Sequence, residues 1–216
     1  MKHESKNMFS KLFIKYPKLE VCKKSVLNAF ECINTTYENN GKLLVCGNGG
    51  SAADSQHIAG ELMKGFLLKR PLSSEEKECF VKYGGKNIAE GLQGALPAIS
   101  LVGETALFTA FLNDCEPDLV FAQQVYGLMN NTDTLLCLST SGNSKNVVQA
   151  AITAKAKGGK VVSVTGASGG KLSEISDVTI KLPSEITYEI QEYTLPVYHA
   201  ICAMLEAEWF RVSETE

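Results

Sequence analysis

The stretch that decides the fold runs from Leu43 to Phe66 and reads LLVCGNGGSAADSQHIAGELMKGF. Its apolar start, Leu43 to Cys46, is long enough for a buried strand and too short for a helix. A glycine-rich turn follows, and residues 51–66 contain many helix formers and no proline. A strand, a glycine turn and a helix amino terminus together form an anion site, because free backbone amides and the helix dipole point into the turn.

The alternation of strands and helices continues along the rest of the chain. Apolar runs predict further strands at residues 97–102, 134–138, 160–165 and 178–182. Helices are predicted at residues 105–112, 117–129, 145–157 and 187–210, the last with Pro196 inside it. This alternation predicts a parallel sheet covered by helices on both faces. We expect an α/β fold of the flavodoxin- or Rossmann-like class, a three-layer αβα sandwich with a five-stranded parallel sheet.

Two segments flank or interrupt this pattern. Residues 1–40 predict an N-terminal helical extension, with a short helix followed by a longer one from Leu19 to Asn39. The apolar stripe of the longer helix is formed by Val21, Val26, Leu27, Phe30 and Ile33. Residues 67–95 are charged, contain a Gly-Gly break and predict an inserted helical segment that begins near Ser74. We expect residues 1–216 to form a single domain.

Composition limits the possible partners and the compartment. The chain has 216 residues and a net charge of −3, which gives no general attraction to nucleic acid or to anionic membranes. No apolar run approaches the length of a membrane span, and the first residues lack the apolar core of a signal peptide. The seven cysteines are scattered and odd in number, so we expect reduced thiols and a cytoplasmic protein.

The glycine turn formally matches a dinucleotide fingerprint, Gly47-x-Gly49-x-x-Ala52. That fingerprint also requires an acidic residue about 20 positions further on, at the end of a second strand, to bind the ribose. Residues 67–71 read LLKRP, which is basic and not strand-like. We therefore expect no nucleotide cofactor.

A second candidate anion site lies in the loop Ser139-Thr140-Ser141-Gly142-Asn143-Ser144, between a predicted strand and a predicted helix. Ser144 is well placed to cap the helix, and capping alone would explain one hydroxyl. The loop carries four hydroxyls, which exceeds that need. A phosphate monoester has several acceptor oxygens that such donors and the helix dipole would match, so we expect phosphate binding here.

Candidates for acid–base or metal chemistry are few. His57 and Glu61 are four residues apart on a predicted helix and face the same way, an arrangement that can hold a divalent metal or orient a base. Gln191 and His199 lie on the last helix, about 12 Å apart along its axis and about 80° apart around it. Convergence of all four on one metal would need long side-chain reach, a kink at Pro196 or contributions from different subunits.

These motifs closely resemble the sugar isomerase (SIS) domain family, specifically the bacterial phosphoheptose (sedoheptulose 7-phosphate) isomerases. The resemblance covers residues 41–66 and 96–210, most of the chain. It rests on the sequences CGNGGSAADSQHIAGEL, FLND, LSTSGNS, VTGASGGKL and IQEYTLPVYHAIC.

The resemblance implies roles for individual residues. Substrate phosphate would be held by Ser139, Thr140, Ser141 and Ser144, and the remaining substrate contacts would come from Asn48, Gly49, Gly50, Ser51, Glu61, Asn113, Asp114 and Gln191. The metal ligands would be His57, Glu61, Gln191 and His199, with one zinc ion per subunit. Glu61 and His199 would be the catalytic acid–base pair. The family assembles as homotetramers.

The resemblance implies an aldose–ketose isomerase that converts sedoheptulose 7-phosphate to D-glycero-D-manno-heptose 7-phosphate through an enediol, in ADP-heptose or related glycan precursor synthesis. Two departures from the family pattern, the length of residues 67–95 and Thr194 in place of a frequent histidine, bear on which sugar phosphate fits. Two alternatives remain open from the sequence. One is an isomerase of another sugar phosphate, and the other is a non-catalytic SIS protein that senses a sugar phosphate or binds the replication initiator protein.

Overall fold

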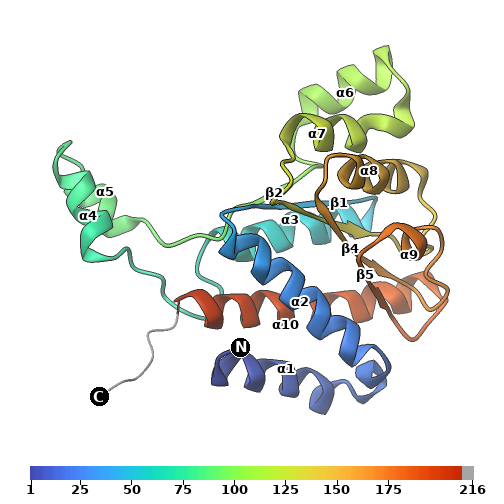
Figure 1. The fold of residues 1–216 in the computed structure, drawn as a ribbon, viewed down its shortest axis with the longest axis horizontal. Coiled ribbons are helices and arrows are strands. Elements are labelled where there is room, and N and C mark those ends of the chain that lie inside the picture. Colours follow the sequence, from blue (N-terminus) through green and yellow to red (C-terminus); the bar gives the residue numbers. More distant parts are fainter. Residues whose placement is uncertain (211–216) are drawn as a thin grey trace.

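The computed structural model describes residues 1–210 and has the predicted three-layer αβα architecture (Figure 1). The strands are β1 (Leu43–Gly47), β2 (Ala98–Ser100), β3 (Thr134–Leu138), β4 (Lys160–Thr165) and β5 (Val178–Lys181). They form one parallel sheet in the order β2-β1-β3-β4-β5. This is the flavodoxin-like order, in which ligands bind at the carboxyl ends of the strands where the order reverses.

Helices cover both faces of the sheet. One face packs against α1 (His3–Lys15), α2 (Lys23–Glu38), α3 (Gly50–Met63) and α10 (Thr187–Phe210), and the other against α7 (Val120–Leu128), α8 (Lys145–Ala156) and α9 (Leu172–Ile175). Alternation along β1 separates the two cores, because Leu43 and Val45 join the first and Leu44 and Cys46 the second. None of the helices within residues 1–210 combines the length and apolar character needed to cross a bilayer.

The N-terminal extension differs from its prediction. The expected helix from Leu19 to Asn39 is a 3₁₀ turn at Pro17–Cys22 followed by α2, which begins at Lys23. Val21, placed in the buried stripe, is 77% exposed, whereas Phe30 and Ile33 are buried. A 3₁₀ turn advances by a larger angle per residue than an α-helix. The spacing that places Phe30 and Ile33 on the buried face of α2 therefore does not apply to Val21, which lies in the 3₁₀ turn.

Smaller differences concern the ends of elements. Asn113 and Asp114, predicted as a turn, are the last two residues of α6 (Thr105–Asp114). A 3₁₀ turn at Pro117–Leu119 precedes α7, and α10 continues as one helix through Pro196.

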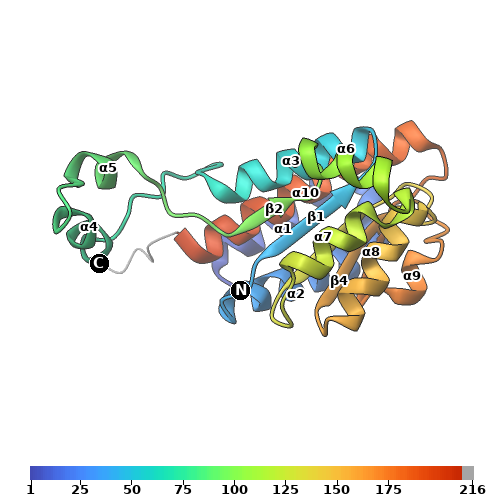
Figure 2. The ribbon, with the colours of Figure 1, turned by 90° about the horizontal axis from the view of Figure 1, so that it is seen from above.

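The inserted segment extends away from the sheet (Figures 1 and 2). It consists of α4 (Ser74–Val81) and α5 (Lys86–Gly91). The chain leaves and returns through a narrow neck, where Pro71 pairs with Gln93 and the Gly94 amide donates to the Arg70 carbonyl at 2.7 Å. Helix α4 begins at Ser74, near the predicted start, and its amino-terminal cap is Ser73, in a reciprocal capping box with Glu76.

A buried ion pair fixes the base of this segment to α10. Arg70 Nε donates to Glu206 Oε1 at 2.8 Å, and both side chains are about 1% exposed or less. The guanidinium also donates to the backbone carbonyls of Leu62 and Glu61 at the end of α3. The Glu206 carboxylate accepts three backbone amides, those of Phe66, Leu67 and Leu68. The pair therefore joins the carboxyl end of α3, the neck and α10.

We predict that Glu206→Gln lowers the free energy of unfolding by about 3–5 kcal/mol, because it leaves the Arg70 charge buried without a counter-ion. Urea unfolding at a fixed protein concentration measures the change. The matched control is Glu20→Gln, which removes an exposed pair with Lys23 and should change stability by no more than about 0.5 kcal/mol. Equal losses in the two variants would contradict the prediction.

Candidate active site

The glycine turn brings the backbone of β1 very close to the start of α3. A Cβ on Gly47 would lie 2.7 Å from the Ser51 Cβ, so a side chain at this position would clash. Gly49 is the N-cap residue of α3 and has a φ of +57°, a conformation that L side chains rarely adopt. The turn is exposed at residues 48–50. The first amides of α3 therefore face open space at the carboxyl edge of the sheet.

A reciprocal hydrogen-bond pair joins this turn to the next loop. Asn48 Nδ2 donates to Asn146 Oδ1 at 2.8 Å, and Asn146 Nδ2 donates back to Asn48 Oδ1 at 2.9 Å. Asn48 follows β1, and Asn146 lies in the first turn of α8, which follows β3. Since β1 and β3 are neighbours in the sheet, the two predicted anion sites lie side by side.

The loop of residues 139–144, called the hydroxyl loop below, makes hydrogen bonds among its own side chains. Ser144 occupies the N-cap position of α8, but its side chain caps no amide; its Oγ lies 3.0 Å from Ser139 Oγ instead. Simple capping therefore does not explain this hydroxyl. Gly142, with a φ of +65°, allows a close approach to the loop after β4, because a Cβ there would lie 2.1 Å from the Gly169 carbonyl oxygen.

A cleft of about 290 Å³ opens beside this loop. Its walls come from the loops after β3 and β4 and from the start of α10. The lining residues are Thr140, Ser141, Asn143, Gly166, Ala167, Ser168, Glu185, Thr187 and Ile190. The hydroxyls, the Asn143 amide and the backbone at a helix amino terminus suit a phosphate group, whereas the Glu185 carboxylate at the edge of the lining would oppose one.

The predicted acid–base residues meet where α3 packs against α10. His57 Nε2 lies 3.1 Å from Glu61 Oε1 on α3. The His199 ring, from α10, lies edge-on to the His57 ring with their centroids 4.9 Å apart. Lys64 Nζ donates to Glu61 Oε2 at 3.2 Å. His57, Glu61 and His199 therefore lie next to one another within one chain.

His199 is poised as a neutral base. Its Nε2 is buried and has no hydrogen-bond partner. Burial lowers the pKa of the imidazole, and the nearby His57 lowers it further, while Glu61 partly opposes both effects. Phe66 packs against the ring at 5.4 Å between centroids and helps to exclude water. A neutral ring with an unpaired nitrogen can accept a proton or bind a metal ion.

Two residues that the sequence did not single out, Tyr198 and Asp54, are hydrogen-bonded on the Nδ1 side of His57. The Tyr198 hydroxyl lies 2.9 Å from His57 Nδ1 and donates to Asp54 Oδ1 at 3.2 Å. Burial raises the pKa of the Asp54 carboxyl, and the Tyr198 hydrogen bond and His57 partly offset that rise. Asp54 precedes His57 by three residues on the same helix face, which was an available signal. The contact of Tyr198 depends on how α10 packs and had no signal in the sequence.

Other predicted site residues lie apart from the histidines. The Gln191 amide faces the first turn of α3, where a Cβ on Gly50 would be 3.0 Å from Gln191 Nε2. Gly50 precedes His57 by seven residues, about 10 Å along the helix. Asn113 and Asp114 are exposed at the end of α6, and Asn113 Nδ2 donates to Asp114 Oδ1 at 2.8 Å. Ser51 is buried behind the glycine turn.

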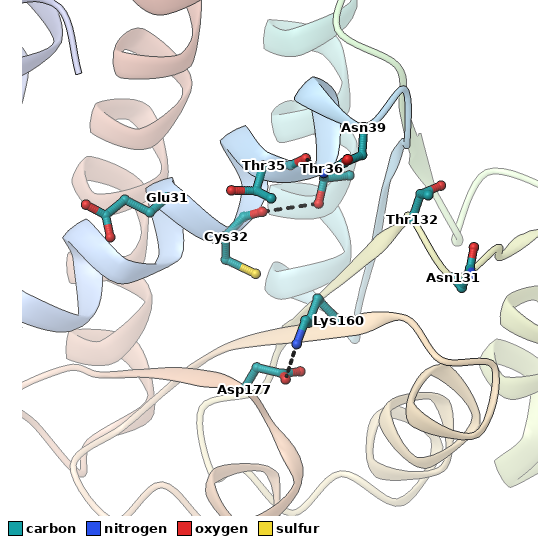
Figure 3. A pocket seen from close by; sticks show the side chains of 9 residues that line it. All are labelled: Glu31, Cys32, Thr35, Thr36, Asn39, Asn131, Thr132, Lys160 and Asp177. Atoms are coloured by element: carbon teal, nitrogen blue, oxygen red, sulfur yellow. Dashed lines mark hydrogen bonds and ion pairs between the residues drawn. The ribbon is translucent and has the colours of Figure 1, made fainter.

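A larger pocket of about 450 Å³ lies at the opposite, amino-terminal edge of the strands (Figure 3). It is lined by Glu31, Cys32, Thr35, Thr36, Asn39, Asn131, Thr132, Lys160 and Asp177. Two of its charged groups already pair with each other, since Asp177 accepts from Lys160 at 3.2 Å, and Asp177 also accepts from Lys155 at 2.8 Å. Size alone therefore does not make this pocket the functional site.

The side chains at the α3–α10 contact do not form a closed metal-binding group. Among residues 1–210, no three His, Cys, Asp or Glu side chains come together closely enough to form a metal-binding group. His57 and Glu61 are in contact, but His199 touches the pair through the edge of a ring rather than through a converging nitrogen.

Comparisons with known proteins identify the family of this chain. The sequence model of the SIS domain matches residues 18–76 and 76–166. A phosphoheptose isomerase of Helicobacter pylori is 38% identical over 188 residues, covering 87% of this chain and 86% of that protein. The solved phosphoheptose isomerase of Francisella tularensis has 31% identity and a TM-score of 0.73, covering 88% of this chain and 90% of that one.

A second solved phosphoheptose isomerase, from Neisseria gonorrhoeae, has 30% identity and a TM-score of 0.70, covering 94% of this chain and 91% of that one. The match thus extends over both cores, the glycine turn, the hydroxyl loop and α10. The chain belongs to the SIS domain family and, within it, to the phosphoheptose isomerases.

Proposed function

We propose that this protein is an aldose–ketose isomerase that converts sedoheptulose 7-phosphate to D-glycero-D-manno-heptose 7-phosphate, for ADP-heptose or related glycan precursor synthesis. One observation carries the proposal: the Glu61 carboxylate on α3 and the His199 imidazole on α10 both lie against His57, and the hydroxyl-lined cleft adjoins the start of α10. The seven free thiols suit a cytoplasmic enzyme.

The reaction moves a proton between C1 and C2 of the sugar. A base removes a proton from C1 of the ketose while an acid protonates the C2 carbonyl oxygen, which gives the enediol. A proton is then returned to C2 while the C1 hydroxyl gives up its proton to a base and becomes the aldehyde oxygen. Glu61 and His199 share these transfers. Lys64 Nζ pairs with Glu61 Oε2 at 3.2 Å, and the lowered pKa of His199 keeps its ring able to accept a proton.

The phosphate end of the sugar is held by the hydroxyl loop. Ser139, Thr140, Ser141 and Ser144 supply donors, and the α8 amino terminus adds its dipole. Asn48, Gly49 and Gly50 form a surface that the sugar backbone can approach closely. Binding energy at the phosphate then orients carbons that lie one to two helix turns away.

The proposal includes one zinc ion per subunit. The donor set fits zinc, because it combines two imidazoles with a carboxylate and because His199 Nε2 is buried without a partner. His57, Glu61 and His199 would hold the ion; Gln191, the fourth predicted ligand, would need a longer reach or a contribution from a neighbouring subunit. When bound, the ion would polarise the sugar carbonyl and hydroxyl.

We predict that Glu61→Gln and His199→Ala each reduce kcat for sedoheptulose 7-phosphate isomerisation by at least about 100-fold, because each removes a proton-transfer group. The assay follows aldose–ketose interconversion with and without added zinc. Glu90→Gln, on the exposed α5, is the matched control and should keep full activity. Unchanged rates in the first two variants would refute the role assignment, and an inactive wild-type protein would refute the function.

The phosphate site gives a separate prediction. Ser144→Ala removes a donor that no backbone cap requires, so the KM for the phosphorylated sugar should rise about 10- to 100-fold with little loss of stability. Ser25→Ala, whose hydroxyl bonds its own helix backbone on α2, should leave KM unchanged. A Ser144→Ala enzyme with an unchanged KM would place the phosphate elsewhere.

The proposal also includes a homotetramer. Helix α6 has no buried residue although it carries Leu107 and Leu112, which are 41% and 43% exposed. A helix of this composition needs a covering surface. We predict a sedimentation mass of four chains. A monomer mass at micromolar concentration would contradict this assembly.

A further inference from the structure

The Asn143 side chain, in the hydroxyl loop, is fixed at both of its polar atoms. Its Nδ2 donates to the Ser141 carbonyl oxygen at 3.0 Å, and its Oδ1 accepts the backbone amide of Lys171 at 3.0 Å. Lys171 belongs to the segment that follows β4. The Asn143 amide therefore connects the loops after β3 and β4, which form two walls of the cleft beside the hydroxyl loop.

These two partners determine which way the amide faces. A carbonyl oxygen requires a donor opposite it and a backbone N–H requires an acceptor, so exchanging Oδ1 and Nδ2 of Asn143 would break both hydrogen bonds. The Nδ2 group carries two hydrogens, and the Ser141 carbonyl uses one of them. Within residues 1–210 the second hydrogen has no acceptor, although Asn143 is exposed and lines the cleft.

The Ser141 hydroxyl, which lines the same cleft, also has a hydrogen left to donate. Its Oγ accepts the backbone amide of Asn143 at 3.1 Å, so its own proton is not used in that hydrogen bond. The two residues thus offer one free N–H and one free O–H from positions two apart in the loop. Donors of this kind match the acceptor oxygens of a phosphate group.

The charge of the cleft makes neutral donors important. Among the described residues that line it there is no Lys or Arg side chain, and there is one carboxylate, that of Glu185. An anion in this cleft is therefore held by N–H and O–H groups and by the helix dipole. A donor that two protein groups already hold in place loses little conformational freedom when a ligand binds.

We infer that Asn143 is a phosphate-binding residue of this cleft, and that its second Nδ2 hydrogen donates to a phosphate oxygen. The inference rests on the proposed function, because it concerns the phosphate end of the proposed substrate. It also differs from a role in the turn alone. Asn and Asp are both frequent turn residues, so a turn role tolerates Asp at this position, whereas a donor to phosphate does not.

The first test is an amide NMR titration of the full chain with inorganic phosphate. Asn143→Asp keeps an acceptor for the Lys171 amide, but it replaces the donor and adds a negative charge. Its Kd for phosphate should rise at least about 10-fold, and that of Asn143→Ala about 10-fold. The Lys171 amide signal shows whether its hydrogen bond is kept, and thermal melts check that each variant is folded.

Asn131 provides the matched control. It is an exposed asparagine that precedes β3 and lines the pocket at the opposite edge of the sheet. Asn131→Asp makes the same change in net charge outside the cleft, and it should keep the wild-type Kd for phosphate. A similar loss in Asn131→Asp and Asn143→Asp would assign the effect to net charge and overturn the inference.

The second test uses the kinetics of sedoheptulose 7-phosphate isomerisation. Asn143→Asp should raise KM at least about 10-fold and change kcat much less, because the lost hydrogen bond is made to the phosphate and not to the reacting carbons. A damaged fold would instead lower the amount of active enzyme and leave KM unchanged. An unchanged KM in Asn143→Asp would overturn the inference.

The phosphate titration is independent of catalysis. A Kd for phosphate in Asn143→Asp within twofold of the wild-type value would leave Asn143 a turn residue and overturn the inference, as would a wild-type protein that binds no phosphate. A protein with the expected phosphate affinities but no isomerase activity would keep the inference and remove the proposed function.

Discussion

The parallel packing of α3 against α10 is the constraint on which the site depends. It is fixed at both ends. At the start of α3 the Gln191 amide lies over Gly50, where any side chain would meet it at 3.0 Å. At the end of α3 the buried Arg70 guanidinium binds the last carbonyls of the helix and the Glu206 carboxylate on α10. The side chains of His57, Glu61 and His199 lie between these two points, so their separation is set by contacts that do not involve those side chains.

The order of strands in the sheet positions the other part of the site, the two loops at its carboxyl edge. Neighbouring parallel strands end at one edge, so the turn after β1 and the loop after β3 must lie together. The reciprocal Asn48–Asn146 pair then fixes how they face each other. Anion binding needs rigid backbone donors, whereas proton transfer needs side chains with a tuned environment. The fold places the backbone donors in the loops after β1 and β3, and it places the titratable side chains on the helix pair α3 and α10.

Sequence periodicity predicts the sheet well, because a buried strand needs only a short apolar run between turn signals. It fails where two helical geometries meet, as at Val21, since the 3₁₀ turn before α2 changes the phase of the stripe. In the site, local spacing predicts that His57 and Glu61 touch. It cannot predict that His199 joins them while Gln191, eight residues earlier, contacts the other end of α3. That outcome depends on helix packing between segments more than 100 residues apart, as does the contact of Tyr198 with His57.

The length of α3 bears on the shape of the substrate. The hydroxyl loop and the glycine turn lie at its amino end, and the His57–Glu61 pair lies about 10 Å further along. A substrate that engages both must place its phosphate and its reacting carbons at opposite ends of a molecule that spans this gap. A phosphorylated sugar in its open-chain form does so, whereas a closed ring brings the two ends closer together. If the loop binds the phosphate as proposed, that binding favours the open chain, which is the form that carries the carbonyl needed for isomerisation.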